Sequence, residues 1–325
     1  MDTRWPIYLN RPIRTLVFIV VGSVFCTGAA VRADTVYVGS SFTGTIERFD
    51  PNGNASLFGY ASGSPEGLAF DNSGNLYVGS GSTDVIDKFD SDGNRSVFAT
   101  AASGVSGPAG LAFDSTGNLC VANGVNDTIE KFDTNGVGSV FASLAHFPGP
   151  QGLAFDHNGN LYLANQGANT IEKFDTNGNG SIFASSSLDF PTGLAFDSSG
   201  NLYVANDGNN TITKFDTNGV GSVFASSSLS IPYGVAFDSA GDLYVTNVGN
   251  NTITKFDPSG HGSLFANSGM HYPLYIAVQV PEPSTWGLVA LGGLCLLSRC
   301  RFSNRLPLVS MRTPAIVGLD NPPPR

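Results

Sequence analysis

The fold is decided by a phrase that the chain repeats, and a complete copy occupies residues 193–226: GLAFDSSGNLYVANDGNNTITKFDTNGVGSVFAS. The phrase contains four short runs rich in Leu, Val, Ile, Phe and Thr, and Asp, Asn, Ser and Gly separate them. Such runs predict β-strands, and Ser-Gly and Asn-Gly pairs supply the positive φ that tight hairpins need. One copy of the phrase therefore predicts a sheet of four antiparallel strands.

The phrase returns at a nearly constant spacing. Its opening, Gly-Leu-Ala-Phe-Asp, starts at residues 67, 110, 152 and 193, and a version with Val in place of Leu starts at residue 234. The successive spacings are 43, 42, 41 and 41 residues. A period in the low forties made of short strands is typical of β-propeller blades.

Six segments match the second run of the phrase, at residues 35–39, 75–79, 118–122, 160–164, 201–205 and 242–246. Only five of them follow a first run of their own. Residues 273–278, Pro-Leu-Tyr-Ile-Ala-Val, fall one period after residues 232–237 and are expected to supply the missing strand. The sequence therefore predicts an all-β, six-bladed β-propeller over residues 34–279, with four antiparallel strands per blade and a first blade closed by the C-terminal strand.

The run Phe-Asp-Ser-Ser-Gly-Asn-Leu-Tyr-Val-Ala-Asn at residues 196–206, followed by Asn-Asn-Thr-Ile at 209–212, resembles the NHL repeat and the wider gluconolactonase-like (SMP-30) propellers. The resemblance implies the six-bladed fold. For gluconolactonase-like hydrolases it also implies a divalent cation, held by carboxylates and an amide at the start of the first strands. In this chain only Glu66 matches a carboxylate there, so Glu66 is a weak candidate ligand for Ca²⁺, and no cofactor is expected.

The first 33 residues predict a secretory signal peptide. Arg4, Arg11 and Arg14 precede an apolar run at residues 16–25, and small residues follow as far as Ala33. This order of basic, apolar and small residues is typical of a cleaved signal. The rival interpretation is a membrane anchor, but a bilayer span needs about 20 apolar residues.

Residues 280–301 resemble a PEP-CTERM sorting signal. Pro281, Glu282 and Pro283 precede an apolar stretch at residues 286–297, and a basic cluster begins at Arg299. The resemblance implies a Gram-negative bacterium, sorting machinery that acts on the C-terminus, a membrane contact through this segment, and delivery to the cell surface or extracellular matrix. An ordinary tail anchor is the alternative. Residues 302–325 are expected to be a disordered or removed tail.

The predicted propeller is strongly acidic. Residues 34–279 contain seven Lys and Arg against 23 Asp and Glu, a net charge of −16. Nucleic acids and anionic lipids are bound by clustered basic residues, so both are excluded as partners. Six of the basic residues repeat at one third-strand position, which predicts weak pairing with nearby acids. The single cysteine of this region, Cys120, replaces a Tyr of the sister repeats and is expected to be a buried structural thiol.

One position varies where its surroundings repeat. It lies between Pro and Gly at the start of each first strand and is called here the mouth position. It is occupied by Glu66, Ala109, Gln151, Thr192, Tyr233 and Leu274. Propellers bind ligands at the mouth of the central channel, so Glu66, Gln151, Thr192 and Tyr233 are the candidate ligand-binding residues. The alternative is that these side chains only fill a solvated mouth.

No catalytic residue is expected, because none of the four histidines repeats or has an evident partner for general acid–base chemistry. The favoured prediction is a monomeric, exported, non-enzymatic binding or scaffold module for an exopolysaccharide or a surface protein. The first alternative is a gluconolactonase-like or lyase-like enzyme acting on a sugar lactone or polysaccharide. The second is a structural matrix protein with no specific ligand.

Overall fold

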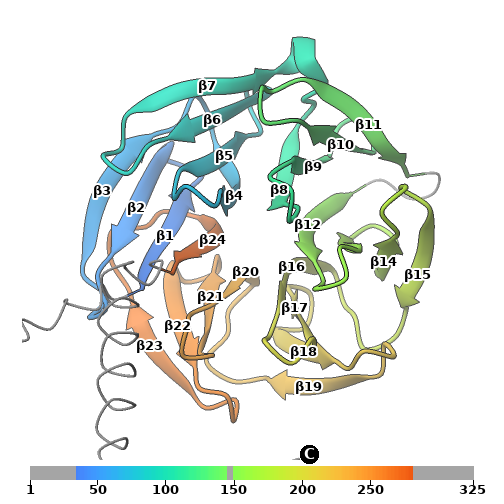
Figure 1. Cartoon of the computed structure of the whole chain (residues 1–325). Coiled ribbons are helices and arrows are strands. Elements are labelled where there is room, and N and C mark those ends of the chain that lie inside the picture. Colours follow the sequence, from blue (N-terminus) through green and yellow to red (C-terminus); the bar gives the residue numbers. More distant parts are fainter. Residues whose placement is uncertain (1–33, 145–148, 281–325) are drawn as a thin grey trace, which may run out of the picture. The chain divides into compact units, whose positions relative to one another are not determined.

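The computed structural model describes residues 34–144 and 149–280. In these residues six sheets of four antiparallel strands are arranged in a ring about a central axis (Figure 1), here called the channel, which confirms the predicted six-bladed propeller. The predicted signal peptide, the Pro281–Glu282–Pro283 motif and the tail at residues 302–325 lie outside the described part. Within it, no helix is long and apolar enough to cross a membrane.

Each blade has an inner strand at the channel, a second strand, a third strand and an outer strand. Blade 1 is β24 (Pro273–Gln279), β1 (Thr35–Ser40), β2 (Thr45–Phe49) and β3 (Ala55–Tyr60); blade 2 is β4 (Pro65–Phe70), β5 (Leu76–Ser80), β6 (Val85–Phe89) and β7 (Arg95–Thr100), followed by the 3₁₀ helix η1 (Ala101–Ser103). Blade 3 is β8 (Pro108–Phe113), β9 (Leu119–Asn123), β10 (Thr128–Phe132) and β11 (Gly138–Ser143); blade 4 is β12 (Pro150–Phe155), β13 (Leu161–Asn165), β14 (Thr170–Phe174) and β15 (Gly180–Ala184). Blade 5 is β16 (Pro191–Phe196), β17 (Leu202–Asn206), β18 (Thr211–Phe215) and β19 (Gly221–Ala225); blade 6 is β20 (Pro232–Phe237), β21 (Leu243–Asn247), β22 (Thr252–Phe256) and β23 (Gly262–Ala266).

Blade 1 is closed by the two ends of the propeller, as predicted. Strand β24 pairs antiparallel with β1, with Val36 opposite Val278 and Val38 opposite Ile276. Because β24 covers the edge of β1 that faces the channel, this edge is not exposed to pairing with another chain.

Asp residues at the hairpins between first and second strands determine where the second strands begin. The Asp197 carboxylate accepts hydrogen bonds from the backbone N–H groups of Ser199 and Asn201, both at 2.9 Å, and from the Asn201 side chain at 2.7 Å. Gly200 supplies the positive φ of this turn. In blades 2 to 6 the residue at the Asn201 position is thus part of the hairpin, and the second strand begins one residue later than predicted.

The core lies between blades, where aromatic rings of neighbouring blades interlock. The Tyr203 ring of β17 contacts Phe224 of β19 and Phe237 of β20 edge to face, at centroid distances of 4.9 and 5.0 Å. Six apolar clusters of this kind fill the spaces around the ring. Edge-to-face pairs add about 0.5–1.5 kcal/mol each beyond the area that they bury.

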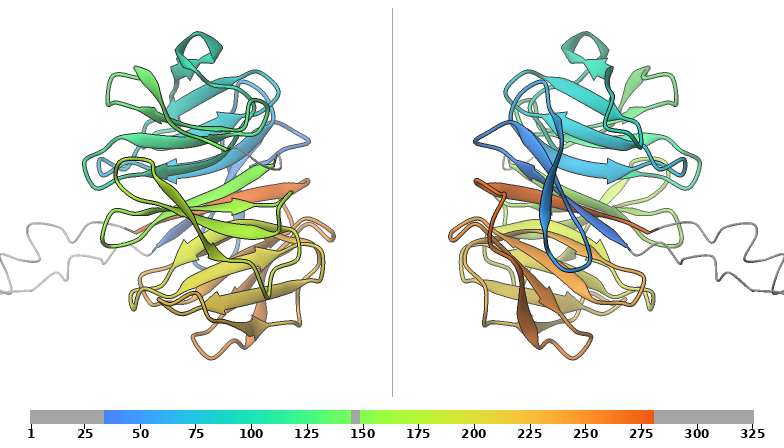
Figure 2. Two further views of the ribbon diagram at one scale, coloured as in Figure 1. Left: turned by 90° about the vertical axis from the view of Figure 1, so that its right-hand side faces the viewer. Right: turned by 90° about the vertical axis from the view of Figure 1, so that its left-hand side faces the viewer.

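The loops gather at two opposite faces of the ring (Figure 2). The hairpin face carries the turns between first and second strands and between third and outer strands. The channel face carries the loops that lead into the inner strands and the loops between second and third strands. Asp34 accepts hydrogen bonds from Ser239, and Gln279 donates to the carbonyl of Gly74 at 3.4 Å. Ser239 and Gly74 belong to first hairpins, so both ends of the propeller leave from the hairpin face.

Candidate functional site

The inner strands approach one another so closely that the residue after each mouth position is Gly in five blades. A Cβ on Gly67, Gly110, Gly152, Gly193 or Gly234 would collide with the carbonyl oxygen at the next mouth position. Blade 1 departs from this rule, because Tyr275 occupies the corresponding place in β24. Blade 1 is therefore the one blade of the six that has a side chain, that of Tyr275, at this position of the inner strand.

Tyr275 and Tyr233 converge on one amide in the channel. Oη of Tyr233 donates to Oε1 of Gln151 at 2.7 Å, and Oη of Tyr275 lies 3.4 Å from the same oxygen. The two rings meet edge to face at 5.3 Å. Blades 1 and 4 are opposite in a ring of six (Figure 1), so the contact between Tyr275 and Gln151 crosses the channel. Burial raises the pKa of both tyrosine hydroxyls, which keeps them neutral donors.

Glu66 lies at the same mouth, at the start of β4. Its carboxylate lies against Gly81 of the next loop, so closely that a side chain at residue 81 would collide with it. Burial raises the pKa of Glu66 to about 7, whereas a free glutamate has a pKa near 4.5. No hydrogen bond or ion pair joins Glu66 to another residue in the described part of the chain. A half-buried carboxylate that is bonded to no other described residue keeps its acceptor oxygens available, which makes Glu66 the strongest candidate for contact with a ligand.

Thr192 has a different environment from the other three candidates. It is fully buried, and its hydroxyl lies 3.0–3.4 Å from the carbonyl oxygens of Ala205, Pro232 and Tyr233. In this arrangement its hydroxyl joins blades 5 and 6. The structure thus brings Gln151 and Tyr233 into direct contact, places Glu66 at the same mouth, and buries Thr192 between blades 5 and 6. The assignment of all four to a ligand site stays a prediction.

A second variable ring was missed by the sequence analysis. The residue that follows each second strand also differs between blades: Ser41, Gly81, Gly124, Gln166, Asp207 and Val248. Nε2 of Gln166 donates to Oδ2 of Asp207 at 3.2 Å. Burial, with a smaller contribution from the charge of Asp189, raises the pKa of Asp207. Comparing this position across the repeats would have found the ring, in the way that the mouth positions were found.

The Asn residues that end the second strands brace loops and do not line the channel. Asn206 is fully buried; its amide donates to Thr211 and Thr213 at 3.1 and 2.9 Å, and its carbonyl accepts from the N–H of Asp189 at 3.1 Å. Through these contacts the Asn206 side chain holds the loop before β16 and the start of β18 in place.

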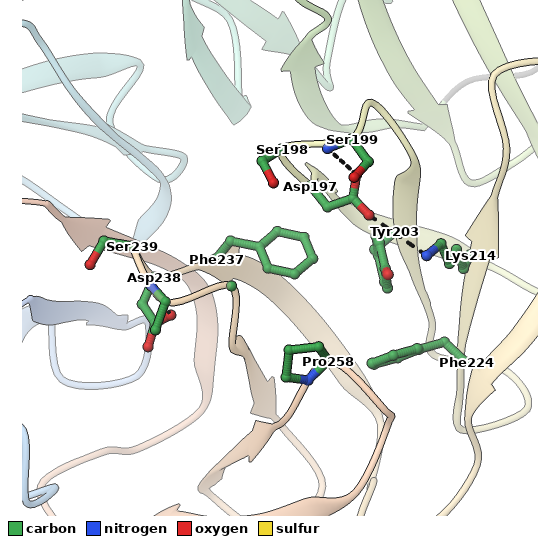
Figure 3. Close-up of a pocket in the computed structure, with 12 residues that line it drawn as sticks. Asp197, Ser198, Ser199, Tyr203, Lys214, Phe224, Phe237, Asp238, Ser239 and Pro258 are labelled. Carbon is green, nitrogen blue, oxygen red and sulfur yellow. Dashed lines mark hydrogen bonds and ion pairs between the residues drawn. The ribbon is translucent and has the colours of Figure 1, made fainter.

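A cavity of about 340 Å³ lies on the hairpin face between blades 5 and 6 (Figure 3). Its lining includes Lys214, whose Nζ lies 3.7 Å from Oδ2 of Asp197 and 5.2 Å from the centre of the Tyr203 ring. The Asp–Lys pair recurs in blades 2, 3, 4 and 6, as the sequence predicted. Because the Asp, Lys, Tyr and Phe residues of the lining recur at the same positions in most blades, we assign this cavity to the scaffold.

No group of three or more His, Cys, Asp or Glu side chains that could hold a metal ion occurs in residues 34–144 and 149–280. The mouth positions offer one carboxylate, Glu66, whereas Ca²⁺ takes six to eight oxygen ligands. Cys120 is fully buried and burial raises the pKa of its thiol to about 12, as expected for a structural residue.

Comparison with known proteins gives two family matches. The sequence model of the Virginiamycin B lyase family matches residues 27–286, and that of the PEP-CTERM protein-sorting motif matches residues 279–301. No curated protein matches the chain.

Several solved structures share the fold. A chain of a nidogen/laminin complex is 23% identical with a TM-score of 0.67, covering 75% of this chain and 98% of that one. A streptogramin B lyase is 16% identical with a TM-score of 0.61, covering 74% and 82%. Virginiamycin B lyase from Staphylococcus aureus is 16% identical with a TM-score of 0.58, covering 71% and 80%. At these identities the likeness extends to the fold alone.

Proposed function

Because the chain belongs to the virginiamycin B lyase family and carries a PEP-CTERM sorting motif, we propose that it is an exported propeller that binds its ligand at the channel mouth without catalysing a reaction. It acts at the surface or in the extracellular matrix of a Gram-negative bacterium, as a binding or scaffold module. The gluconolactonase-like specificity that the repeats suggested is not needed for this role.

The observation that carries the proposal is the arrangement of Glu66, Tyr233, Tyr275 and Gln151. The two tyrosines and the amide form a polar floor across the channel, and the Glu66 carboxylate lies beside them without a partner. Such a mouth offers donors and acceptors to a ligand rich in hydroxyl groups, such as an exopolysaccharide. Among the six mouth positions Glu66 carries the one carboxylate, and no second carboxylate or histidine occupies these positions to complete an acid–base pair.

The route of the chain also supports display of the mouth. The sorting motif follows directly after β24, and β24 ends at the hairpin face. Any attachment made through the residues after Gln279 thus joins the propeller at the face opposite the mouth. The channel face is left open to a ligand from outside.

A microarray of bacterial exopolysaccharides tests the proposal with the purified exported protein. We expect binding that weakens by about tenfold in Glu66→Gln and in Tyr233→Phe, since each removes a polar anchor from the mouth. The matched control is His157→Ala, which changes an exposed side chain on the hairpin face. Absence of binding, or equal binding by the mouth variants and the parent, would refute the proposal.

A second candidate function is that of a lyase, favoured by the pKa of about 7 at Glu66, which suits a general base near neutral pH. The relatives of known structure include a virginiamycin B lyase and a streptogramin B lyase. Incubation with virginiamycin B, followed by chromatography of the remaining compound, distinguishes the two functions. Consumption by the parent and by His157→Ala, but not by Glu66→Gln, would replace the binding module with an enzyme.

The metal-dependent lactonase is tested separately by calorimetric titration with Ca²⁺. One carboxylate is too few for a tight site, so we expect no saturable heat at millimolar Ca²⁺. Saturable heat in the parent that is lost in Glu66→Gln would revive the lactonase.

A further inference from the structure

Three consecutive blades expose a bulky apolar side chain on the channel face. Phe190, Ile231 and Tyr272 each stand directly before the Pro that begins the inner strand of blades 5, 6 and 1. Their exposed fractions are 50, 44 and 54%. We call these three residues the apolar arc. Phe42 of blade 1 is 86% exposed in the adjoining loop, where the N–H of Ser41 donates to the carbonyl of Tyr272 at 3.2 Å.

The backbone of the arc is strained. The φ angles of Phe190, Ile231 and Tyr272 are 51°, 49° and 58°, in the left-handed region that bulky side chains avoid. The corresponding residues of blades 3 and 4 are Gly107 and Gly149, also with positive φ. Glycine adopts this conformation without strain, and the chain uses it in these two blades, whereas blade 2 has Ser64 at the corresponding position without a positive φ.

The turn does not need the arc side chains for its hydrogen bonds. The N–H of Phe190 donates to Asn169 at 2.6 Å, that of Ile231 to Asn210 at 2.6 Å, and that of Tyr272 to Asn251 at 2.7 Å. These bonds use the backbone and would remain with Gly. Strained residues persist where they serve a function, so the half-exposed side chains point to a binding role.

The charges beside the arc have one sign. Asp189 precedes Phe190, Asp207 lies in the adjoining loop near Asp189, and Glu66 shares the mouth with Tyr233. The Lys and Arg residues of the described ranges lie on third strands, or at the start of an outer strand in the case of Arg95. None belongs to the loops of the channel face. The surface around the arc is therefore apolar and acidic, so a partner complementary to it would be apolar and positively charged.

We propose that the apolar arc and its acidic neighbours dock a polypeptide segment that carries Lys or Arg beside aliphatic or aromatic side chains. The proposal rests on the binding role proposed above and names a partner for the same face. A strip that extends over three blades suits an extended chain with several side chains, and the rings of Phe190 and Tyr272 offer faces to a cation. A basic segment also finds here the negative field that speeds its encounter.

Fluorescence anisotropy with three labelled synthetic peptides of about ten residues tests the docking surface. One peptide alternates Lys and Leu, the second Glu and Leu, and the third Lys and Ser. We expect saturable binding of the Lys–Leu peptide at physiological salt, weakened at higher salt, with no binding of the other two. Equal binding of the Glu–Leu peptide would overturn the proposal, because charge would then play no part.

The decisive variant replaces Phe190, Ile231 and Tyr272 by Gly. Because Gly relieves the strain at positive φ, its melting temperature should equal or exceed that of the parent, while Lys–Leu binding falls by about tenfold or more. The matched control replaces Val140, Val223 and Leu264 by Ser, since these are exposed apolar residues of outer strands. Equal loss of binding in the control, or a lower melting temperature in the Gly variant, would overturn the proposal.

The outcomes separate the two proposals. Exopolysaccharide binding without peptide binding would refute the docking surface and leave the binding module intact. If the protein bound neither the microarray nor the Lys–Leu peptide, both would fail.

Discussion

The two faces of the propeller are built from the same repeat, but residues are repeated from blade to blade on the hairpin face and vary on the channel face. On the hairpin face each turn Asp is bonded to the backbone two and four residues on, and in five blades a Lys of the third strand pairs with the Asp of the first hairpin. On the channel face the residues at the mouth positions differ between blades. The fold requires neither the carboxylate of Glu66 nor the three bulky side chains of the apolar arc. Positions that hold the same residue in most blades therefore belong to the scaffold, and positions that vary between blades belong to the candidate site.

The largest expected effect tests the regular part of the channel wall. In Gly193→Ala the new Cβ would collide with the carbonyl of Tyr233 in the next blade, and backbone cannot yield as a flexible side chain can. We expect a loss of about 3–4 kcal/mol in the free energy of unfolding, measured by urea denaturation.

The control for this variant is Gly241→Ala on the hairpin face. Gly241 has a φ of 86°, but a Cβ there would meet nothing within 4 Å, so only the left-handed backbone is penalised, by about 1 kcal/mol. Equal losses in the two variants would show that the close approach of the inner strands is not the reason why Gly follows the mouth position in five blades.

Glu66 supplies the next effect, which depends on pH. Its pKa is about 7 in the folded protein and near 4.5 when free, so the folded state holds the proton more tightly. The associated stability is fully present below pH 4.5 and is lost as the pH rises to about 7. The shift corresponds to at most about 3 kcal/mol. Melting temperatures of the parent and of Glu66→Gln should diverge over this window, with the variant more stable at pH 8.

A control in the same series is Glu172→Gln, which removes a third-strand carboxylate that accepts a bond from Asn165 at 2.8 Å. If the difference between parent and Glu66→Gln were flat from pH 4 to pH 8, Glu66 would not titrate in this range, and its choice as the centre of the site would lose its basis.

Much of the fold could be predicted from the sequence because the repeat specifies it six times. The closing strand at residues 273–278 was predicted because one period separates it from residues 232–237. The floor of the mouth could not be predicted in this way. Tyr275 breaks the glycine rule in one blade, and its contact with Gln151 depends on which blades are opposite each other. Thr192 occupies a variable position, yet its short side chain turns back onto carbonyl groups.

The smallest expected effect compares one aspartate from each face. Burial opposes ionisation of Asp197, but bonds from Asn201 and Ser199 and the charge of Lys214 outweigh it, so its pKa is lowered. Burial raises the pKa of Asp207. At neutral pH, Asp197→Asn should therefore cost about 1 kcal/mol of stability, whereas Asp207→Asn should be neutral or slightly stabilising.

The pH dependence of the two aspartate variants has opposite signs, and urea denaturation at several pH values measures it. A lowered pKa stabilises the fold above the unfolded pKa, and this contribution is lost as the pH falls through the folded pKa, so the cost of Asp197→Asn should shrink in acid. A raised pKa destabilises the fold once the group ionises, so any gain from Asp207→Asn should also vanish in acid. If Asp207→Asn were instead as costly as Asp197→Asn, the channel-face carboxylate would be as firmly bonded as the scaffold one, and the distinction between the two faces would fail at this position.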